Sequence, residues 1–150
     1  MTSSFTLALG ADHGGVALKD KLAAALIAAG YKVQDYGTND SGSVDYPDYA
    51  HAVCEAVEEK KADYGVLVCG SGIGMSIAAN RHPGIRCGLV HDVTTARLTR
   101  AHNDANVLAL GARIIGEEVA LDILRVFLAT HFEGGRHGRR LAKLNLDTEA

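Results

Sequence analysis

The 150-residue sequence has no tryptophan, only two prolines and only three cysteines. Three cysteines without a C-x-x-C pair give no disulfide framework and no zinc knuckle. Few prolines beside 17 glycines favour tight backbone turns over stiff linkers. Basic residues are not in excess either, because 15 Lys and Arg stand against 18 Asp and Glu and leave a net charge of −3. A nucleic-acid partner is therefore not expected.

The sequence also lacks a long apolar run. Its longest helix-like apolar segment, Leu22 to Ala29, is far shorter than the ~20 residues that span a bilayer. Residues 1–5 carry no basic stretch of the kind that opens a signal peptide. We therefore expect a cytoplasmic protein with reduced thiols and no membrane partner. The length and the 47% content of hydrophobic residues predict one globular domain over residues 1–150.

What the sequence does contain is a regular alternation of strand-like and helix-like segments. Short apolar runs predict strands over residues 5–9, 31–36, 64–69, 85–90 and 107–110. Residues 16–29, 46–57, 73–80, 91–102 and about 120–127 have the spacing of helices. In the first helix, Leu18, Leu22 and Leu26 form the inner face, and Lys19 and Lys21 are expected to point away from it.

Strands that are apolar throughout are typical of parallel sheets that are buried on both faces. The sequence therefore predicts an α/β fold: one three-layer α/β/α domain around a five-stranded, parallel, Rossmann-like sheet. In such sheets ligands bind beyond the carboxyl ends of the strands. Those ends carry Asp12 and His13 after the first strand, residues 69–74 after the third and Arg113 after the fifth.

The segment Cys69-Gly-Ser-Gly-Ile-Gly74 is the most informative one. Its glycines allow backbone N–H groups to face a ligand. A dinucleotide fingerprint does not fit, because the pattern is G-x-G-x-G after the third strand, and no G-K-[ST] follows for a P-loop. What remains is an anion cradle that begins with a cysteine, a candidate nucleophile or base. Cys54 and Cys87 fall on a helix stripe and inside a strand, where cysteine usually packs as a small hydrophobe.

The other polar groups each have a structural alternative. Asp12 and His13 could meet a substrate, or Asp12 could cap the first helix. His102 and Asn103 precede the fifth strand, but a histidine is also favoured where a helix ends. Tyr46 could line the site or pack against the start of the second helix.

Arginines in the polar tail suggest a binding site for phosphate. Arg136 and Arg140, four positions apart on a helical tail, can clamp one phosphate, and Arg113 could join them. A single surface arginine, however, more often contacts only solvent than binds a phosphate. Three histidines show no partner at the spacing typical of metal ligands: His51, His82 and His131. No metal site is expected.

Seven motifs occur together and in order: Gly10-Ala-Asp-His-Gly-Gly, Asp45-Tyr-Pro, Cys69-Gly-Ser-Gly-Ile-Gly, Ile77-Ala-Ala-Asn, Ala101-His-Asn-Asp-Ala-Asn-Val-Leu, Leu110-Gly-Ala-Arg and Phe132-Glu-Gly-Gly-Arg-His. Each is weak alone, but the ordered set is specific. It resembles the B-type ribose-5-phosphate isomerases and their hexose-phosphate relatives, such as galactose-6-phosphate isomerase subunits. The resemblance covers about residues 5–145.

The resemblance implies an aldose–ketose isomerase that uses neither metal nor cofactor and works through a cis-enediolate. It implies Cys69 as the base that moves a proton between C2 and C1, with Ser71 as a hydroxyl proton shuttle. His102 would open the furanose ring, and Asn103 would support the enediolate. The N–H groups of one segment would hold the developing oxyanion: Gly70, Gly72, Ile73 and Gly74.

The resemblance also implies the substrate contacts. Asp12 would bind sugar hydroxyls, and four basic residues would hold the phosphate: His13, Arg113, Arg136 and Arg140. Met75 stands where one branch of the family has a carboxylate base, so the chain is expected in the cysteine branch. Family members are dimers or tetramers with composite sites. We therefore expect at least a homodimer, with the basic tail at about 131–150 packing on the partner.

Three functions stay open at this point. The first is the interconversion of ribose 5-phosphate and ribulose 5-phosphate in the pentose phosphate pathway. The second is isomerisation of another phosphosugar, such as allose 6-phosphate, galactose 6-phosphate or a tetrose phosphate. The third is a non-catalytic phosphosugar- or nucleotide-binding module, which would not need a thiol at the cradle. Cys69 and His102 are expected at opposite edges of the sheet, roughly 15 Å apart, so one substrate would need both subunits.

Overall fold

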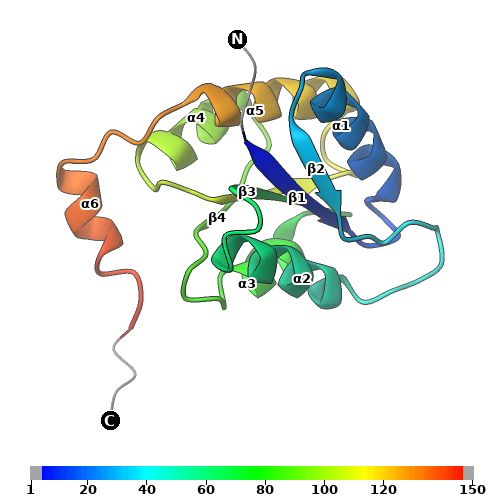
Figure 1. Cartoon of the computed structure of the whole chain (residues 1–150), viewed down its shortest axis with the longest axis horizontal. Helices are drawn as coiled ribbons and strands as arrows, with labels where there is room; N and C mark the ends of the chain where they lie inside the picture. The colour runs from blue at the N-terminus through cyan, green and yellow to red at the C-terminus, as the bar shows by residue number, and fades with distance from the viewer. Residues whose placement is uncertain (1–4, 147–150) are drawn as a thin grey trace.

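The computed structural model describes residues 5–146, and its sheet is enclosed by helices on both faces (Figure 1). The elements follow the chain as β1 (Thr6–Ala11), α1 (Val16–Ala28), β2 (Lys32–Asp35), α2 (Tyr46–Glu58), β3 (Tyr64–Cys69), α3 (Ile73–Ala79), β4 (Cys87–Leu89), α4 (Val93–Ala101), β5 (Val107–Gly111), α5 (Glu117–Ala129) and α6 (Arg136–Leu141). The predicted three-layer α/β/α fold with a five-stranded parallel sheet is confirmed.

The strands lie in the order β2-β1-β3-β5-β4. The chain leaves β1 towards β2 and then crosses back to β3 on the other side of β1. At such a reversal the loops after the two central strands diverge, which opens a crevice beyond their carboxyl ends. Asp12 directly follows β1 and Cys69 ends β3, so the strand order brings both residues to this crevice.

Apolar residues form two cores, one on each face of the sheet. One core joins α1, α4 and α5, with Leu22 and Phe127 fully buried. The other joins α2 and α3, with Val53 and Met75 fully buried. Figure 1 shows the same division, with α1 and α5 above the sheet and α2 and α3 below it.

The two edge strands differ from the prediction. The strands expected over 31–36 and 85–90 are shortened to Lys32–Asp35 and Cys87–Leu89, and both are only partly buried. An edge strand has a neighbouring strand on one side only, so its other side is open to solvent and the strand is less buried than the central ones. After β4, the helix expected from residue 91 begins at Val93. The Asp92 carboxylate caps this helix by accepting the Thr95 N–H at 2.7 Å. This hydrogen bond lowers the pKa of Asp92.

Lys19 was expected to point away from the core, and this was wrong. Its side chain is fully buried, and its ammonium lies 2.7 Å from both carboxylate oxygens of Asp35 and 3.1 Å from Oδ1 of Asn39. A buried charge is tolerated when it is paired and hydrogen-bonded in this way. The ion pair ties α1 to the end of β2, and the hydrogen bond to Asn39 ties α1 to the loop that follows β2.

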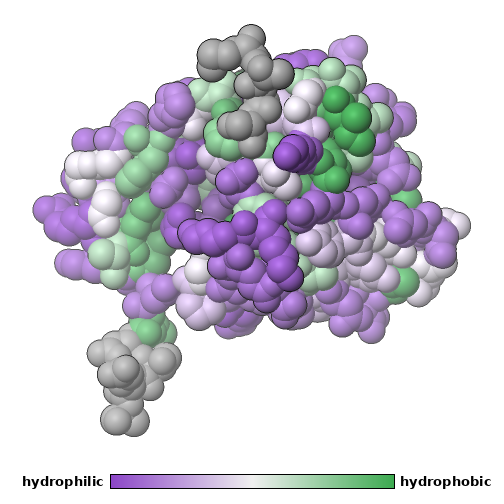
Figure 2. All heavy atoms as spheres, viewed as in Figure 1, coloured by the Kyte–Doolittle hydropathy of each residue, from purple (hydrophilic) through white to green (hydrophobic). Residues whose placement is uncertain are grey.

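The C-terminal segment is the least embedded part of the described chain. Helix α6 lies away from the sheet and its covering helices (Figure 1), and apolar atoms reach the surface along this segment (Figure 2). Leu144 and Leu146 are 59% and 86% exposed. Within residues 5–146 no helix is both long and apolar enough to cross a membrane.

Candidate active site

A cavity of about 750 Å³ opens at the carboxyl ends of β1, β3 and β5. This volume is within the range of small-molecule sites, ~300–1,000 Å³. Its lining contains most of the residues that the sequence placed at the strand ends: Asp12, Tyr46, Cys69, Gly70, Ser71, Ile73, Gly74 and Arg113, with Ile77 and Ile114 at the margin. The structure therefore brings one half of the predicted site together within a single chain.

Cys69 lies at the end of the central strand β3 and is 5% exposed. Its Sγ accepts a hydrogen bond from the backbone N–H of Gly72 at 3.1 Å. Gly72 has a φ of 79°, a left-handed conformation that turns its N–H back towards the sulfur. The thiolate is the reactive form of cysteine, and the Gly72 N–H is a hydrogen-bond donor that is already directed at this sulfur.

The segment from Gly70 to Gly74 forms the wall next to the thiol. The Ser71 hydroxyl accepts the N–H of Ile73 at 3.2 Å and is only partly buried. Tyr46, which begins α2, packs directly against Gly74, where a Cβ would collide with its ring. Tyr46 is 39% exposed and lines the cavity rather than packing only on its own helix.

Asp12 does not cap α1, because the N-cap position is Gly15 and no side chain bonds there. Instead, Oδ1 of Asp12 accepts the N–H of Gly14 at 2.9 Å, and the residue is 9% exposed. The neighbouring His13 is exposed, and its Nδ1 accepts the N–H of Val44 at 3.2 Å. In the neutral ring the proton is then on Nε2, which can donate to a ligand.

Arg113 approaches the same wall from the loop after β5. Its backbone N–H donates to the carbonyl of Gly70 at 2.9 Å, and its side-chain methylenes pass over Gly70. The guanidinium group is therefore carried on a fixed backbone at the cavity that holds Cys69.

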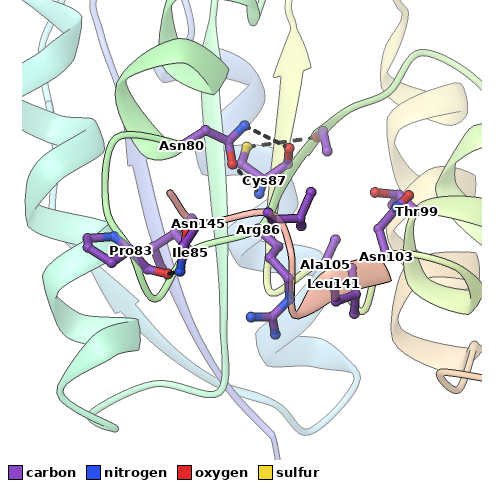
Figure 3. Close-up of a pocket in the computed structure, with 12 residues that line it drawn as sticks. Asn80, Pro83, Ile85, Arg86, Cys87, Thr99, Asn103, Ala105, Leu141 and Asn145 are labelled. Atoms are coloured by element: carbon purple, nitrogen blue, oxygen red, sulfur yellow. Dashed lines mark hydrogen bonds between the residues drawn. The ribbon is translucent and has the colours of Figure 1, made fainter. Parts of the chain in front are cut away.

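His102 and Asn103 lie in a different part of the molecule. His102 is the C-cap residue of α4. It therefore lies where a helix ends, in agreement with the structural alternative to a role in catalysis that the sequence left open. Asn103 lines a second cavity, of about 480 Å³, together with Thr99, Arg86 and residues of the C-terminal segment (Figure 3). No residue of the Cys69 cavity lines it. Arg136 and Arg140, on α6, are exposed and also line neither cavity.

Residues 7–144 match the family model described as Ribose/Galactose Isomerase. The chain belongs to this family. Ribose-5-phosphate isomerase B of Escherichia coli is 45% identical over 90% of this chain and 91% of its own length. D-erythrulose-4-phosphate isomerase of Pectobacterium atrosepticum is 39% identical over 93% and 92%. The solved ribose 5-phosphate isomerase of Thermotoga maritima is 48% identical, with a TM-score of 0.93 over 94% of this chain and 97% of its own. The protein is a sugar-phosphate isomerase of this family.

The other two cysteines of the isomerase are structural, as expected. Cys54 is fully buried in α2, and this burial, reinforced by the Glu58 and Glu55 carboxylates, raises the pKa of its thiol to about 12. Burial also raises the pKa of Cys87, at the start of β4. Both thiols therefore remain protonated at neutral pH, and only Cys69 opens onto the cavity.

Histidine contacts in the isomerase were not found from the sequence. Nδ1 of His51 lies 2.7 Å from Nε2 of His82, whose Nδ1 lies 2.9 Å from the Glu58 carboxylate. The sequence showed no partner for His51 and His82 at the spacing typical of metal ligands, and it gave no sign that the two rings contact each other. These residues are 31 positions apart, and only the packing of α2 against the turn after α3 joins them.

A second group of this kind surrounds His102. The rings of His102 and His137 stack with centroids 4.3 Å apart, and Glu133 lies beside both of them. Burial of the ring, reinforced by the nearby His102 and Arg136, lowers the pKa of His137. The sequence did not predict the contacts of Glu133 and His137 with His102, because the Phe132-Glu-Gly-Gly-Arg-His motif was interpreted only as a source of a phosphate-binding arginine.

Proposed function

We propose that this isomerase interconverts ribose 5-phosphate and ribulose 5-phosphate. The observation that carries the proposal is the Cys69 sulfur at a ligand-sized cavity, with the Gly72 N–H directed at it. A base held there can remove the proton from C2 of the open-chain aldose and return it to C1, which leaves the ketose. Asp12, at the same cavity, supplies a carboxylate for sugar hydroxyls.

The developing charge on the enediolate oxygens needs donors that are already in place. The backbone N–H groups of the wall from Gly70 to Gly74 supply them at little cost in reorganisation. The Ser71 hydroxyl faces the cavity and can carry a proton between O2 and O1. These steps require neither a metal nor a cofactor.

The proposed site is completed by a second subunit. Strand β5 runs from Val107 to Gly111, about 13 Å at ~3.3 Å per residue, and His102 lies beyond its amino end while Cys69 pairs with Gly111 at the other. General acid–base catalysis needs contact within ~3 Å. A two-fold dimer brings opposite edges of two chains together, so His102 of one subunit would open the furanose ring of a sugar held by Cys69 of the other.

Exposed apolar residues support this dimer. Ile73, Ile77 and Ile114 surround the mouth of the Cys69 cavity and are 52%, 54% and 58% exposed. Apolar patches of this kind mark surfaces that another protein covers. Helix α6 would then reach over the partner, and its Arg136 and Arg140 would hold the phosphate opposite Arg113.

Substrate choice is tested by a panel of phosphosugars. The untagged protein, treated with EDTA, is assayed with four-, five- and six-carbon aldose phosphates. We expect the highest kcat/KM with ribose 5-phosphate. A higher value with a tetrose phosphate would instead indicate an activity like that of its Pectobacterium relative, D-erythrulose-4-phosphate isomerase. Binding without isomerisation of any sugar would leave only a binding module.

A further inference from the structure

A cluster with the chemistry of a metal site lies next to the proposed ring-opening histidine. His102, Glu133 and His137 each supply one possible ligand atom, and these atoms lie within 4.8 Å of one another. Oε1 of Glu133 lies 3.5 Å from Nε2 of His137 and 4.0 Å from Nε2 of His102. The three residues come from the end of α4, the loop after α5 and helix α6.

His137 provides a second, independent observation. Its side chain is only 7% exposed, and its Nε2 has no hydrogen-bond partner within residues 5–146. A buried polar nitrogen without a partner costs free energy. This nitrogen is the atom nearest the Glu133 carboxylate, so a ligand in the cluster would satisfy it.

We propose that His102, Glu133 and His137 bind a divalent transition-metal ion of the zinc class, and that the bound ion inhibits the isomerase. Two imidazoles and one carboxylate are a ligand set that zinc uses. Bonds of ~2.0–2.1 Å in a tetrahedral site place ligand atoms about 3.3–3.4 Å apart. The pair at 3.5 Å already has this spacing, and the pair at 4.0 Å needs a shift of a few tenths of an ångström.

Binding requires one ring to leave the stack. The planes of His102 and His137 are 11° from parallel, so one ion cannot lie in both ring planes. His137 is enclosed, whereas the His102 side chain is 38% exposed at the end of its helix and has room to turn. The ion therefore holds His102 in an orientation that differs from its free one.

Charge and ligand type together select the ion. Arg136 and Arg140 are close enough to influence His137, and their charges weaken the binding of any cation. Magnesium and calcium prefer sets of oxygen ligands, whereas imidazole suits zinc, nickel and copper. The cluster therefore selects the second group, with modest affinity.

Inhibition, unlike binding, rests on the proposed function. Ring opening needs the lone pair of His102 to accept a proton, and the ion occupies that lone pair. The bound ion also fixes α6 against the end of α4, which holds Arg136 and Arg140 in one position.

The binding test uses the full, untagged chain after treatment with EDTA and dialysis. Zinc and, separately, cobalt are titrated by calorimetry, and the visible spectrum of cobalt reports its coordination. Glu133→Gln and His137→Gln should each weaken binding by more than about tenfold. The matched controls are His131→Gln, an exposed histidine of the same tail, and Glu118→Gln, an exposed glutamate of α5, and both should bind as the wild type does. Equal affinity in Glu133→Gln and the wild type would overturn the proposal.

The inhibition test compares each variant with itself, with and without the ion. Zinc should lower the wild-type rate and leave that of Glu133→Gln nearly unchanged relative to its own metal-free rate. Equal inhibition of Glu133→Gln, His137→Gln and the wild type would mean that the inhibiting ion binds elsewhere, for example at the Cys69 thiol. That result would overturn the proposal. A metal-free protein without isomerase activity refutes the proposed function instead, and the calorimetric result still decides whether the cluster binds metal.

Discussion

The two edges of the sheet carry two kinds of candidate site, and they are built differently. At the carboxyl edge, backbone N–H groups hold key parts of the site: the Gly72 N–H bonds the Cys69 sulfur, and the Arg113 N–H bonds the carbonyl of Gly70. At the amino edge, His102 ends a helix and meets side chains from a tail that lies away from the sheet.

This difference matches the two tasks of the proposed reaction. Proton transfer at carbon requires a base and donors held within a few tenths of an ångström, which strand ends and backbone bonds provide. Ring opening and phosphate binding tolerate groups that arrive with a second chain. In the proposed dimer, one subunit would supply the groups for proton transfer at its carboxyl edge, and the partner would supply the groups of its amino edge.

Removal of the base tests the carboxyl edge and should have the largest effect. Cys69→Ala should lower kcat by about 10²–10⁴-fold and change the affinity for the phosphosugar only a few-fold, because the phosphate and hydroxyl contacts remain. The control Cys54→Ala removes a buried thiol of α2 that does not line the cavity, and it should keep kcat. A Cys69→Ala enzyme with normal kcat would show that the base is another group.

Subunit mixing tests whether the two edges meet across an interface. Inactive Cys69→Ala and inactive His102→Ala are mixed in equal amounts and allowed to exchange subunits. Random exchange makes half of the dimers mixed, each with one intact site, so about a quarter of the wild-type activity should return. Mass spectrometry of the native dimers checks that exchange took place. Exchange without recovered activity would mean that one chain builds the whole site.

Arginine substitutions compare the two edges directly. Arg113→Met and Arg140→Met should each raise KM by about 10- to 100-fold, because charge-assisted hydrogen bonds contribute ~1.5–3 kcal/mol. Arg139→Met, on the same helix as Arg140 but not proposed to contact phosphate, is the control and should leave KM within a few-fold. If Arg140→Met behaves like Arg139→Met, the tail does not reach the substrate.

The sequence predicted the carboxyl edge well because its signals are local. The strand over 64–69, the cysteine at its end and the three following glycines are contiguous, and the structure reproduces this strand residue for residue. Because the strands are parallel, their carboxyl ends meet at one edge of the sheet, and this brings Asp12 and Arg113 to the same edge.

The amino edge and the buried ion pair were harder to predict because they depend on side chains from distant segments. Lys19 occupies a helix position that the sequence pattern predicts to face solvent, but its ammonium bonds Asp35 at the end of β2 and Asn39 in the following loop, 16 and 20 positions later. Glu133 and His137 likewise become a pair around His102 only after the tail folds back onto α4, where the Glu133 N–H bonds the carbonyl of Ala101.

The smallest predicted effect tests the rigidity of the carboxyl edge itself. In Gly72→Ala, the new Cβ would lie 2.8 Å from a methyl group of Leu89 and 2.9 Å from the carbonyl carbon of Leu110, at a φ of 79°. Such strain costs about 1–3 kcal/mol, which urea unfolding at a fixed protein concentration measures.

Gly116→Ala is the control for this change, because a Cβ there meets no atom within 4 Å and φ is −84°. Its free energy of unfolding should stay within about 0.5 kcal/mol of the wild type. Gly72→Ala should also lower kcat more than it raises KM, because the displaced N–H no longer points at the Cys69 sulfur. If Gly72→Ala matches Gly116→Ala in both stability and kcat, the segment from Gly70 to Gly74 can adjust to an added methyl group. The carboxyl edge would then not be more rigid than the amino edge.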